Sequence, residues 1–319
     1  MKDHVSTRNK WRWAVALSPI LWLSVVFSLS AAASPLTPST AADHFVYLPI
    51  VIKPPEVLVG AGDIADCNTS GREATARLLD GIPGTVVTLG DNAYESGAAV
   101  EFANCYDPAW GRFKARTRPS AGNHDYLTAG ASAYFNYFGA AAGEPGKGYY
   151  SYDLGAWHIV VVNSNCASVG GCDTGSAQEQ WLRSDLAASG AMCTLAYWHH
   201  PLFTSSLRGG NDYMRPIWQA LYDAGAEVVL NGHDHNYERF AAQDPNGSAD
   251  PARGIREFVV GTGGRRHNTF FAPRPNSEVL NGDTFGVIKL TLHPTRYDWE
   301  FLPEAGRTFV DAGSDRCHP

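Results

Sequence analysis

The sequence lacks several features that identify common classes of protein. Acidic residues outnumber basic ones, 32 Asp and Glu against 25 Lys and Arg, so the formal net charge is −7. Nucleic-acid-binding proteins usually carry a basic patch, so we expect no nucleic-acid partner. There is no internal repeat, no Cys-x-x-Cys pair and no His-Glu-x-x-His motif. The last absence argues against a metalloprotease of that helical type.

The N-terminus has the pattern of an export signal. Basic residues precede an apolar run at residues 13–29, and three alanines follow at 31–33. This order predicts a signal peptide over residues 1–33 and a mature protein that is secreted or held in the cell envelope, with no membrane contact after cleavage. A retained membrane anchor is the alternative, because the apolar run approaches the minimum length of a spanning helix.

Residues 34–55 are rich in Pro, Thr, Ser and Ala, which predicts a linker. Its apolar segment, 45–52, is either an edge strand or a surface tether. We predict one catalytic domain over residues 56–315.

Six cysteines form an even set, which in an exported chain favours disulfides over thiols. Fifteen pairings of six cysteines are possible. Cys166 and Cys172 flank a Gly-Gly turn and can close locally. For the remainder we predict Cys67 with Cys105 and Cys193 with Cys317.

From residue 57 onward, short apolar runs repeatedly end in glycine or a polar side chain. Such runs occupy residues 57–61, 86–89, 194–198 and 228–230, and amphipathic segments that predict helices lie at 72–79, 177–188 and 214–224. The pattern predicts an α/β fold, a two-sheet β-sandwich flanked by helices, with ligands presented at the strands' C-terminal ends. The later runs at 257–260, 285–292 and 297–301 predict strands that complete a second sheet.

Polar residues that could bind metal lie at five predicted strand ends, four of which are the ends of the runs at 57–61, 86–89, 194–198 and 228–230. They are Asp63; Asp91 with Tyr94; Asn123 with His124 and Asp125; His199 with His200; and His233 with His235. Residues two apart in an extended segment point the same way, so His233 and His235 can reach adjacent cations. Asp91 can give one carboxylate oxygen to each of two ions, at the roughly 3.5–4 Å separation of two-metal sites. Asn123 would be a neutral oxygen ligand.

These blocks resemble the calcineurin-like metallophosphoesterases, and among them the purple acid phosphatases. The motifs are Gly62-Asp63, Gly90-Asp91-Asn92-Ala93-Tyr94, Gly122-Asn123-His124-Asp125, His199-His200-Pro201 and Gly232-His233-Asp234-His235, in the family's order. The similarity extends over about residues 56–310 and implies the αββα metallophosphoesterase fold.

The resemblance also implies roles for individual residues. Asp63, Asp91, Tyr94 and His235 resemble the ligands of a ferric site, and Asp91, Asn123, His199 and His233 those of a divalent ion, Zn, Fe or Mn. Tyr94 is the residue that points to the purple subgroup. His124 resembles the histidine that touches the substrate phosphate and assists the leaving group.

The adjacent histidines at 199 and 200 are ambiguous by chemistry alone. Neighbouring residues of a strand point to opposite sides, so only one should bind metal. The family's pattern places the ligand two residues before proline, which selects His199. His200 would then support the site from outside.

The chain also departs from the family. Purple acid phosphatases of plants and mammals carry another histidine about ten residues after the equivalent of His199, and residues 202–211 contain none. Arg208 is the only cation there and could bind phosphate through its guanidinium, although it cannot donate a proton near neutral pH. The segment before residue 57 is too short for the β-sandwich that precedes the plant catalytic domain. The six histidines outside the motifs are expected on the surface or in packing.

These observations predict a secreted phosphoesterase that hydrolyses phosphate monoesters with a metal-bridging hydroxide. The substrate would be a small phosphate ester, bound by Asn123, His124 and Arg208. Two alternatives remain: a phosphodiesterase or nucleotide-cleaving enzyme on the same metal core, and a non-catalytic exported binding protein. The sequence does not indicate the oligomeric state.

Overall fold

The computed structural model describes residues 54–270 and 272–318. The predicted export signal (1–33) and most of the predicted linker (34–55), with its apolar segment 45–52, lie outside these residues. Among the described helices, none combines the length and apolar composition needed to cross a membrane.

The first sheet has six strands in the order β13-β12-β11-β1-β2-β3. Strands β1, β2 and β3 are parallel, and β11 pairs antiparallel with β1. The bounds are β1 (Glu56–Ala61), β2 (Thr85–Leu89), β3 (Thr117–Ser120), β11 (Gly286–His293), β12 (Arg296–Pro303) and β13 (Ala312–Arg316).

The second sheet has seven strands in the order β10-β8-β9-β7-β6-β5-β4. Its centre, β5-β6-β7-β9, is parallel. The bounds are β4 (Tyr150–Leu154), β5 (Trp157–Val161), β6 (Cys193–Tyr197), β7 (Val228–Asn231), β8 (Tyr237–Phe240), β9 (Arg256–Val260) and β10 (Ser277–Asn281).

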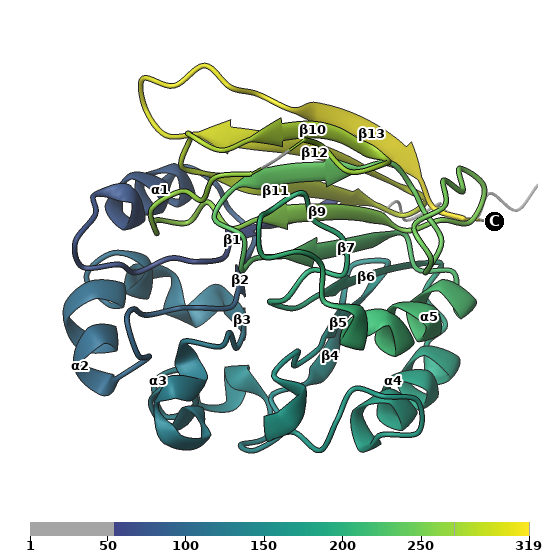
Figure 1. The fold of residues 1–319 in the computed structure, drawn as a ribbon, viewed down its shortest axis with the longest axis horizontal. Coiled ribbons are helices and arrows are strands. Elements are labelled where there is room, and N and C mark those ends of the chain that lie inside the picture. The colour runs from purple at the N-terminus through teal and green to yellow at the C-terminus, as the bar shows by residue number, and fades with distance from the viewer. Residues whose placement is uncertain (1–53, 271, 319) are drawn as a thin grey trace, which may run out of the picture. The chain divides into compact units, whose positions relative to one another are not determined.

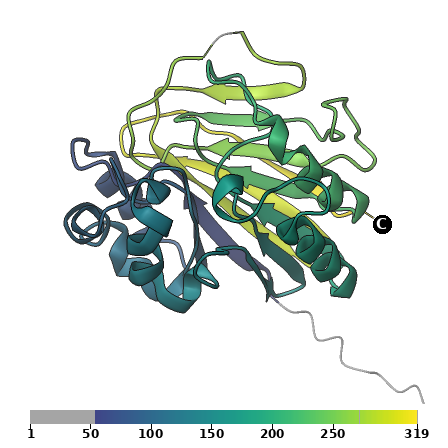
Figure 2. The same ribbon diagram turned by 60° about the horizontal axis from the view of Figure 1, so that its bottom comes forward.

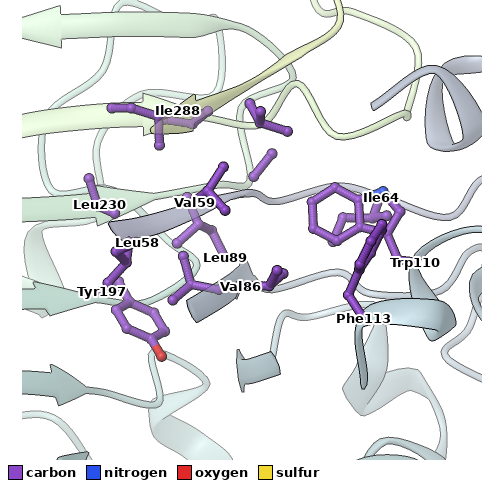
Figure 3. Close-up of a cluster of buried hydrophobic side chains, with 14 of the residues drawn as sticks. Leu58, Val59, Ile64, Val86, Leu89, Trp110, Phe113, Tyr197, Leu230 and Ile288 are labelled. Carbon is purple, nitrogen blue, oxygen red and sulfur yellow. The ribbon is translucent and has the colours of Figure 1, made fainter. Parts of the chain in front are cut away.

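Two sheets pack against each other to form the sandwich (Figure 1). The contact between them buries apolar side chains from both, among them Leu58 and Ile288 of the first sheet and Tyr197 and Leu230 of the second (Figure 3). Alternate residues of the central strands of the second sheet, such as Val229, face the other way, into a second cluster with the helices. Because both faces of these strands are buried, they have the nearly continuous apolar composition of parallel strands.

The helices lie on opposite flanks of the sandwich (Figures 1 and 2). Helices α4 (Ala177–Ala188) and α5 (Arg215–Asp223) contact each other and cover the outer face of the second sheet. The Ser176 hydroxyl accepts the Glu179 amide and caps α4, while a proline in the first turn begins α5. The other flank has α1 (Gly71–Asp80), α2 (Ala99–Glu101) and α3 (Ser132–Phe138).

The predicted sandwich is confirmed, with one correction. The C-terminal strands do not complete a single second sheet: β9 lies beside β7 in the second sheet, whereas β11 and β12 extend the first sheet from β1. Which sheet a strand joins depends on the distant strand with which it forms hydrogen bonds. The periodicity of apolar residues does not identify that partner.

The predicted disulfides are confirmed. Cys67 pairs with Cys105 and Cys166 with Cys172, and Cys193 on β6 pairs with Cys317 near the C-terminus. No cysteine of the chain is free.

Candidate metal centre

The parallel strands of the two sheets bring the predicted polar residues to one place. Asp63 follows β1, Asp91 follows β2 and His233 follows β7. All three have positive φ angles, 59°, 49° and 71°, which is uncommon for residues with a side chain. Such strained conformations concentrate at functional sites, where the surrounding structure maintains them.

One half of the centre consists mainly of oxygen atoms. The Tyr94 hydroxyl lies 2.7 Å from Oδ1 of Asp63 and 2.9 Å from Oδ2 of Asp91. Nε2 of His235 lies 3.4 Å from the same Oδ1 of Asp63. Two carboxylates, one phenol and one imidazole therefore converge, a set of donors suited to a hard cation.

The other half is richer in nitrogen. Oδ1 of Asn123 lies 3.1 Å from Nε2 of His199 and 3.1 Å from Nδ1 of His233. Nε2 of His199 is also 3.3 Å from Oδ2 of Asp91. Imidazole together with oxygen ligands is a combination that Zn²⁺ and related divalent ions accept.

Asp91 joins the two halves through a single oxygen. Its Oδ2 faces both Tyr94 and His199, while its Oδ1 accepts the backbone N–H of His124 at 2.7 Å. This differs from the expected arrangement, in which each carboxylate oxygen would serve one ion.

Backbone carbonyls fix the orientation of two imidazoles. Nδ1 of His199 lies 2.7 Å from the Leu89 carbonyl, and Nδ1 of His235 lies 2.7 Å from the Arg266 carbonyl. A carbonyl only accepts, so Nδ1 carries the proton in both rings. Each Nε2 therefore presents its lone pair to the centre when the ring is neutral, as a metal-ligating histidine does.

The charges of the site fit a bound cation. Asp63 and Asp91 are buried, and within the described part of the chain no lysine or arginine pairs with either carboxylate. Burial alone would raise the pKa of Asp91, but His199 above all holds it well below the usual range. Burial opposes the protonation of His199, yet Asp91 raises its pKa to about 9. Protons thus supply the positive charge in the metal-free protein.

Tyr94 is a phenol in the metal-free protein. Burial and the charges of Asp63 and Asp91 raise its pKa well above the usual value. Ionisation therefore requires a cation strong enough to displace the proton.

Buried groups around the centre hold its loops in place. The Asp125 carboxylate accepts the backbone N–H of Gly122 and the side-chain amide of Asn92, each at 2.9 Å. Gly122 approaches Asp91 so closely that a Cβ there would lie 2.2 Å from both its backbone nitrogen and its Oδ1. These contacts fix the loops that carry Asp91 and Asn123.

His200 lies nearer to the centre than strand alternation predicts. Its ring centroid is 4.5 Å from that of His233, and its Nδ1 bonds the Ser164 hydroxyl at 2.8 Å. Strand β6 ends at Tyr197, so the alternation of a strand does not extend to this residue. Burial and His199 lower the pKa of His200 to about 3, which keeps it neutral.

His124 stands over the oxygen-rich half. Its Nδ1 lies 2.5 Å from the Glu95 carbonyl, so this nitrogen carries a proton. Its Nε2 faces Asp91, 3.9 Å from Oδ2, and its ring centroid is 4.5 Å from that of Tyr94.

Cavities lie on both sides of the centre. One, of about 410 Å³, is lined by Asn123, His200 and the exposed Tyr213. The other, of about 460 Å³, is lined by His235 together with Arg208, Arg265 and Arg266. Arg208 therefore lies beside the site but not among the seven converging side chains.

Sequence reasoning missed Arg265 and Arg266. They follow β9 after Gly263 and Gly264, the same pattern of an apolar run, glycine and a polar side chain that identified the other strand ends. His267, which fitted no motif, packs against Phe285 as expected and also lines this cavity.

Comparisons with known proteins agree with this geometry. The profile of the calcineurin-like phosphoesterase family matches residues 52–237. Purple acid phosphatase 15 of Arabidopsis thaliana is 27% identical over 231 residues, which cover 61% of this chain and 42% of that protein. The chain thus spans less than half the length of this relative.

Among solved structures, purple acid phosphatase PPD1 from yellow lupin (Lupinus luteus) matches with a TM-score of 0.68 and 19% identity, covering 82% of this chain and 53% of that one. GAP50, the anchor in the inner membrane complex of Plasmodium, matches with a TM-score of 0.66 and 15% identity, covering 84% and 90%. At these identities the likeness shows the fold. With the family match over more than half of its length, the chain belongs to the calcineurin-like phosphoesterases and is related to the purple acid phosphatases.

Proposed function

We propose that the protein is a secreted phosphoesterase that needs two metal ions and hydrolyses phosphate monoesters. The observation that carries the proposal is the convergence of seven donor side chains, among which Oδ2 of Asp91 faces both halves of the centre. A family member without catalytic function would have no need to keep this complete set.

The two halves of the centre would hold different cations. Asp63, Asp91, Tyr94 and His235 are the ligands of a trivalent ion in this proposal, and Fe(III) suits their hard oxygen atoms. Asp91, Asn123, His199 and His233 would bind a divalent ion such as Zn, Fe or Mn. When bound, two such cations lower the pKa of a coordinated water and polarise the phosphate.

The chain's own residues would bind and orient the substrate. With Nδ1 of His124 donating to the Glu95 carbonyl, only the protonated ring offers a second N–H, and this Nε2–H would donate to a phosphate oxygen above Asp91. The side chain of Asn123 reaches both His199 and His233, so it would meet a phosphate at the second half. Arg208 would bind the part of the substrate that extends into the neighbouring cavity.

Residues 202–211 contain no second histidine that could protonate the leaving group. His124 is the histidine whose Nε2 faces Asp91 without belonging to the seven candidate ligands. We therefore assign it both roles, phosphate contact and proton donor.

Secretion is supported by the disulfides and by the composition of residues 1–33. Expression of the full chain with its leader should yield a mature N-terminus near Ser34 in the medium or envelope fraction. An N-terminus still at Met1 in a membrane fraction would instead favour the retained anchor.

The test of activity compares p-nitrophenyl phosphate with its bis-ester on protein of measured metal content. We expect two metals per chain and a monoester rate well above the diester rate. A purple colour that disappears in Tyr94→Phe would identify iron bound to the phenolate. Metal-loaded protein that hydrolyses neither ester would rule the proposal out, and a dominant diester rate would assign the phosphodiesterase alternative.

A further inference from the structure

The cavity beside His235 has an unusual concentration of charge. Its lining includes Asp66, Glu95, Arg208, Arg265 and Arg266, and it opens next to the oxygen-rich half of the metal centre. We call this space the arginine cavity. Since His235 belongs to both, a substrate phosphate at the centre lies at the entrance to this cavity.

One of the three arginines is already neutralised. Nη2 of Arg265 lies 2.9 Å from one oxygen of Glu95, Nη1 also bonds the other oxygen of Glu95, and Nη1 lies 2.8 Å from Oδ2 of Asp66. The guanidinium also stacks 4.7 Å from the centre of the Tyr94 ring. Arg265 therefore supports the wall of the centre, and it uses both carboxylates of the cavity.

The other two guanidinium groups have no acidic partner. Arg208 and Arg266 are exposed, and neither forms an ion pair with a carboxylate in the part of the chain that the structure describes. The Arg266 carbonyl bonds the His235 ring, which anchors this residue directly behind the centre. Asn268, another lining residue, has a buried side-chain amide nitrogen without a described partner.

These donors exceed what a simple monoester needs. A trivalent cation, a divalent cation and the protonated His124 ring, set against two carboxylates, one phenolate and one hydroxide, leave two positive charges, which already match the two negative charges of a phosphate monoester. Two unpaired guanidinium groups in the adjoining cavity are additional. Guanidinium forks bind phosphate oxygens in pairs and with charge assistance.

We propose that the arginine cavity binds a second phosphate group of the substrate through Arg208 and Arg266. The preferred substrates would then carry a phosphate next to the one that is hydrolysed, as in condensed phosphates and other compounds with neighbouring phosphate groups. This inference rests on the proposed function, because it assumes that the first phosphate binds at the metal centre.

Binding of three phosphonates to the metal-loaded protein tests the inference without turnover. The probes are methylphosphonate, phosphonoacetate and methylenediphosphonate, measured by calorimetry at fixed ionic strength. A diphosphonate also binds cations more strongly than a monophosphonate, so its higher affinity for the wild type alone would not implicate the arginines. The test is therefore whether the affinity ratio changes between the wild type and the variants. The variants are Arg208→Gln and Arg266→Gln, with Arg316→Gln as control, because Arg316 is exposed on β13, forms no ion pair among the described residues and does not line the cavity.

The expected result is a change in the affinity ratio of methylenediphosphonate to methylphosphonate. A lost charge-assisted contact should reduce this ratio about tenfold in each cavity variant, while Arg316→Gln keeps the wild-type ratio. An unchanged ratio in both cavity variants would overturn the inference. Phosphonoacetate losing as much affinity as methylenediphosphonate would overturn the assignment to phosphate and favour a carboxylate.

The outcome is separable from that of the proposed function. Wild-type protein that hydrolyses p-nitrophenyl phosphate but shows no effect of Arg208→Gln or Arg266→Gln on the ratio contradicts the second phosphate alone. Failure to hydrolyse p-nitrophenyl phosphate contradicts the proposed function, whatever the ratio.

Discussion

The substitution Tyr94→Phe should change the number of protons released when metal binds. Tyr94 keeps its phenolic proton in the metal-free protein because burial and the charges of Asp63 and Asp91 raise its pKa well above the usual value. His199 is also protonated below about pH 9, since Asp91 outweighs the opposing effect of burial on its pKa. Both protons must leave before phenolate and neutral imidazole can bind cations.

The structure gives the size of the penalty. His199 has a pKa of about 9, so at pH 7, two units lower, the ring is almost entirely protonated. Metal binding must remove this proton. This weakens apparent metal affinity about a hundredfold, or about 2.7 kcal/mol. Because the pKa is raised, the penalty shrinks as pH increases and vanishes above about pH 9. Affinity should therefore rise with pH across the neutral range.

Calorimetric titration of the metal-free protein at pH 8 measures this directly. Titrations with a ferric complex in two buffers of different ionisation enthalpy give the protons released per chain. Wild type should release one proton more than Tyr94→Phe. Tyr134→Phe is the matched control, because Tyr134 is buried and the one partner of its hydroxyl among the described residues is the Pro119 carbonyl. Equal proton release by wild type and Tyr94→Phe would refute the role of Tyr94 as a ligand.

Three further predictions concern the stability of the fold. Gly122→Ala places a Cβ 2.2 Å from Asp91, so it should cost about 1–3 kcal/mol in unfolding free energy and reduce kcat/KM for p-nitrophenyl phosphate at least tenfold. Asp125→Ala leaves buried N–H groups without an acceptor and should lower the urea unfolding free energy by about 3 kcal/mol; a loss below 1 kcal/mol would contradict its role in the loops. Replacing Cys193 and Cys317 by alanine opens a link across 124 residues, and we expect a loss of about 4–5 kcal/mol in unfolding free energy. Reductant opens all three disulfides of the wild type and should cost at least as much.

The sequence was most informative where local pattern and chemistry coincide. Strands β1, β2, β6 and β7 are buried on both sides, so their apolar runs stand out and their ends are marked by glycine or histidine. Helix α4 was predicted with its observed bounds, residues 177–188. The strand-end loops supplied the candidate side chains, and the resemblance to the metallophosphoesterases selected among them the seven that the structure brings together.

Edge strands were not predictable in this way. Strand β13 (Ala312–Arg316) contains no large apolar residue and is mostly exposed, and β10 (Ser277–Asn281) is only partly buried. Their conformation depends on pairing with β12 and β8, which are distant in the sequence or separated by long loops. The same dependence on distant partners explains why the sheet of β11 and β12 was assigned incorrectly.

Within the site, the sequence could not give the orientation of side chains in loops. Strand alternation predicted that His200 points away from the centre, but it lies beyond the end of β6 and its ring approaches His233. The sequence also could not show that Arg265 forms ion pairs with Asp66 and Glu95, because these two residues approach from other loops. For the same reason it could not show that Arg208 and Arg266 have no such partner among the described residues. Such contacts emerge only when the strand ends are assembled.

The central claim of the proposed function is that Asp91, which faces both halves of the centre, would serve two metal ions that support phosphoester hydrolysis. The most direct test is the rate of phosphate release from p-nitrophenyl phosphate by metal-loaded Asp91→Asn, beside Asp173→Asn, which alters an exposed carboxylate without a described side-chain partner. We predict a fall on the order of a thousandfold and the loss of at least one bound metal in Asp91→Asn, with Asp173→Asn at the wild-type rate. Wild-type turnover by Asp91→Asn would contradict the account.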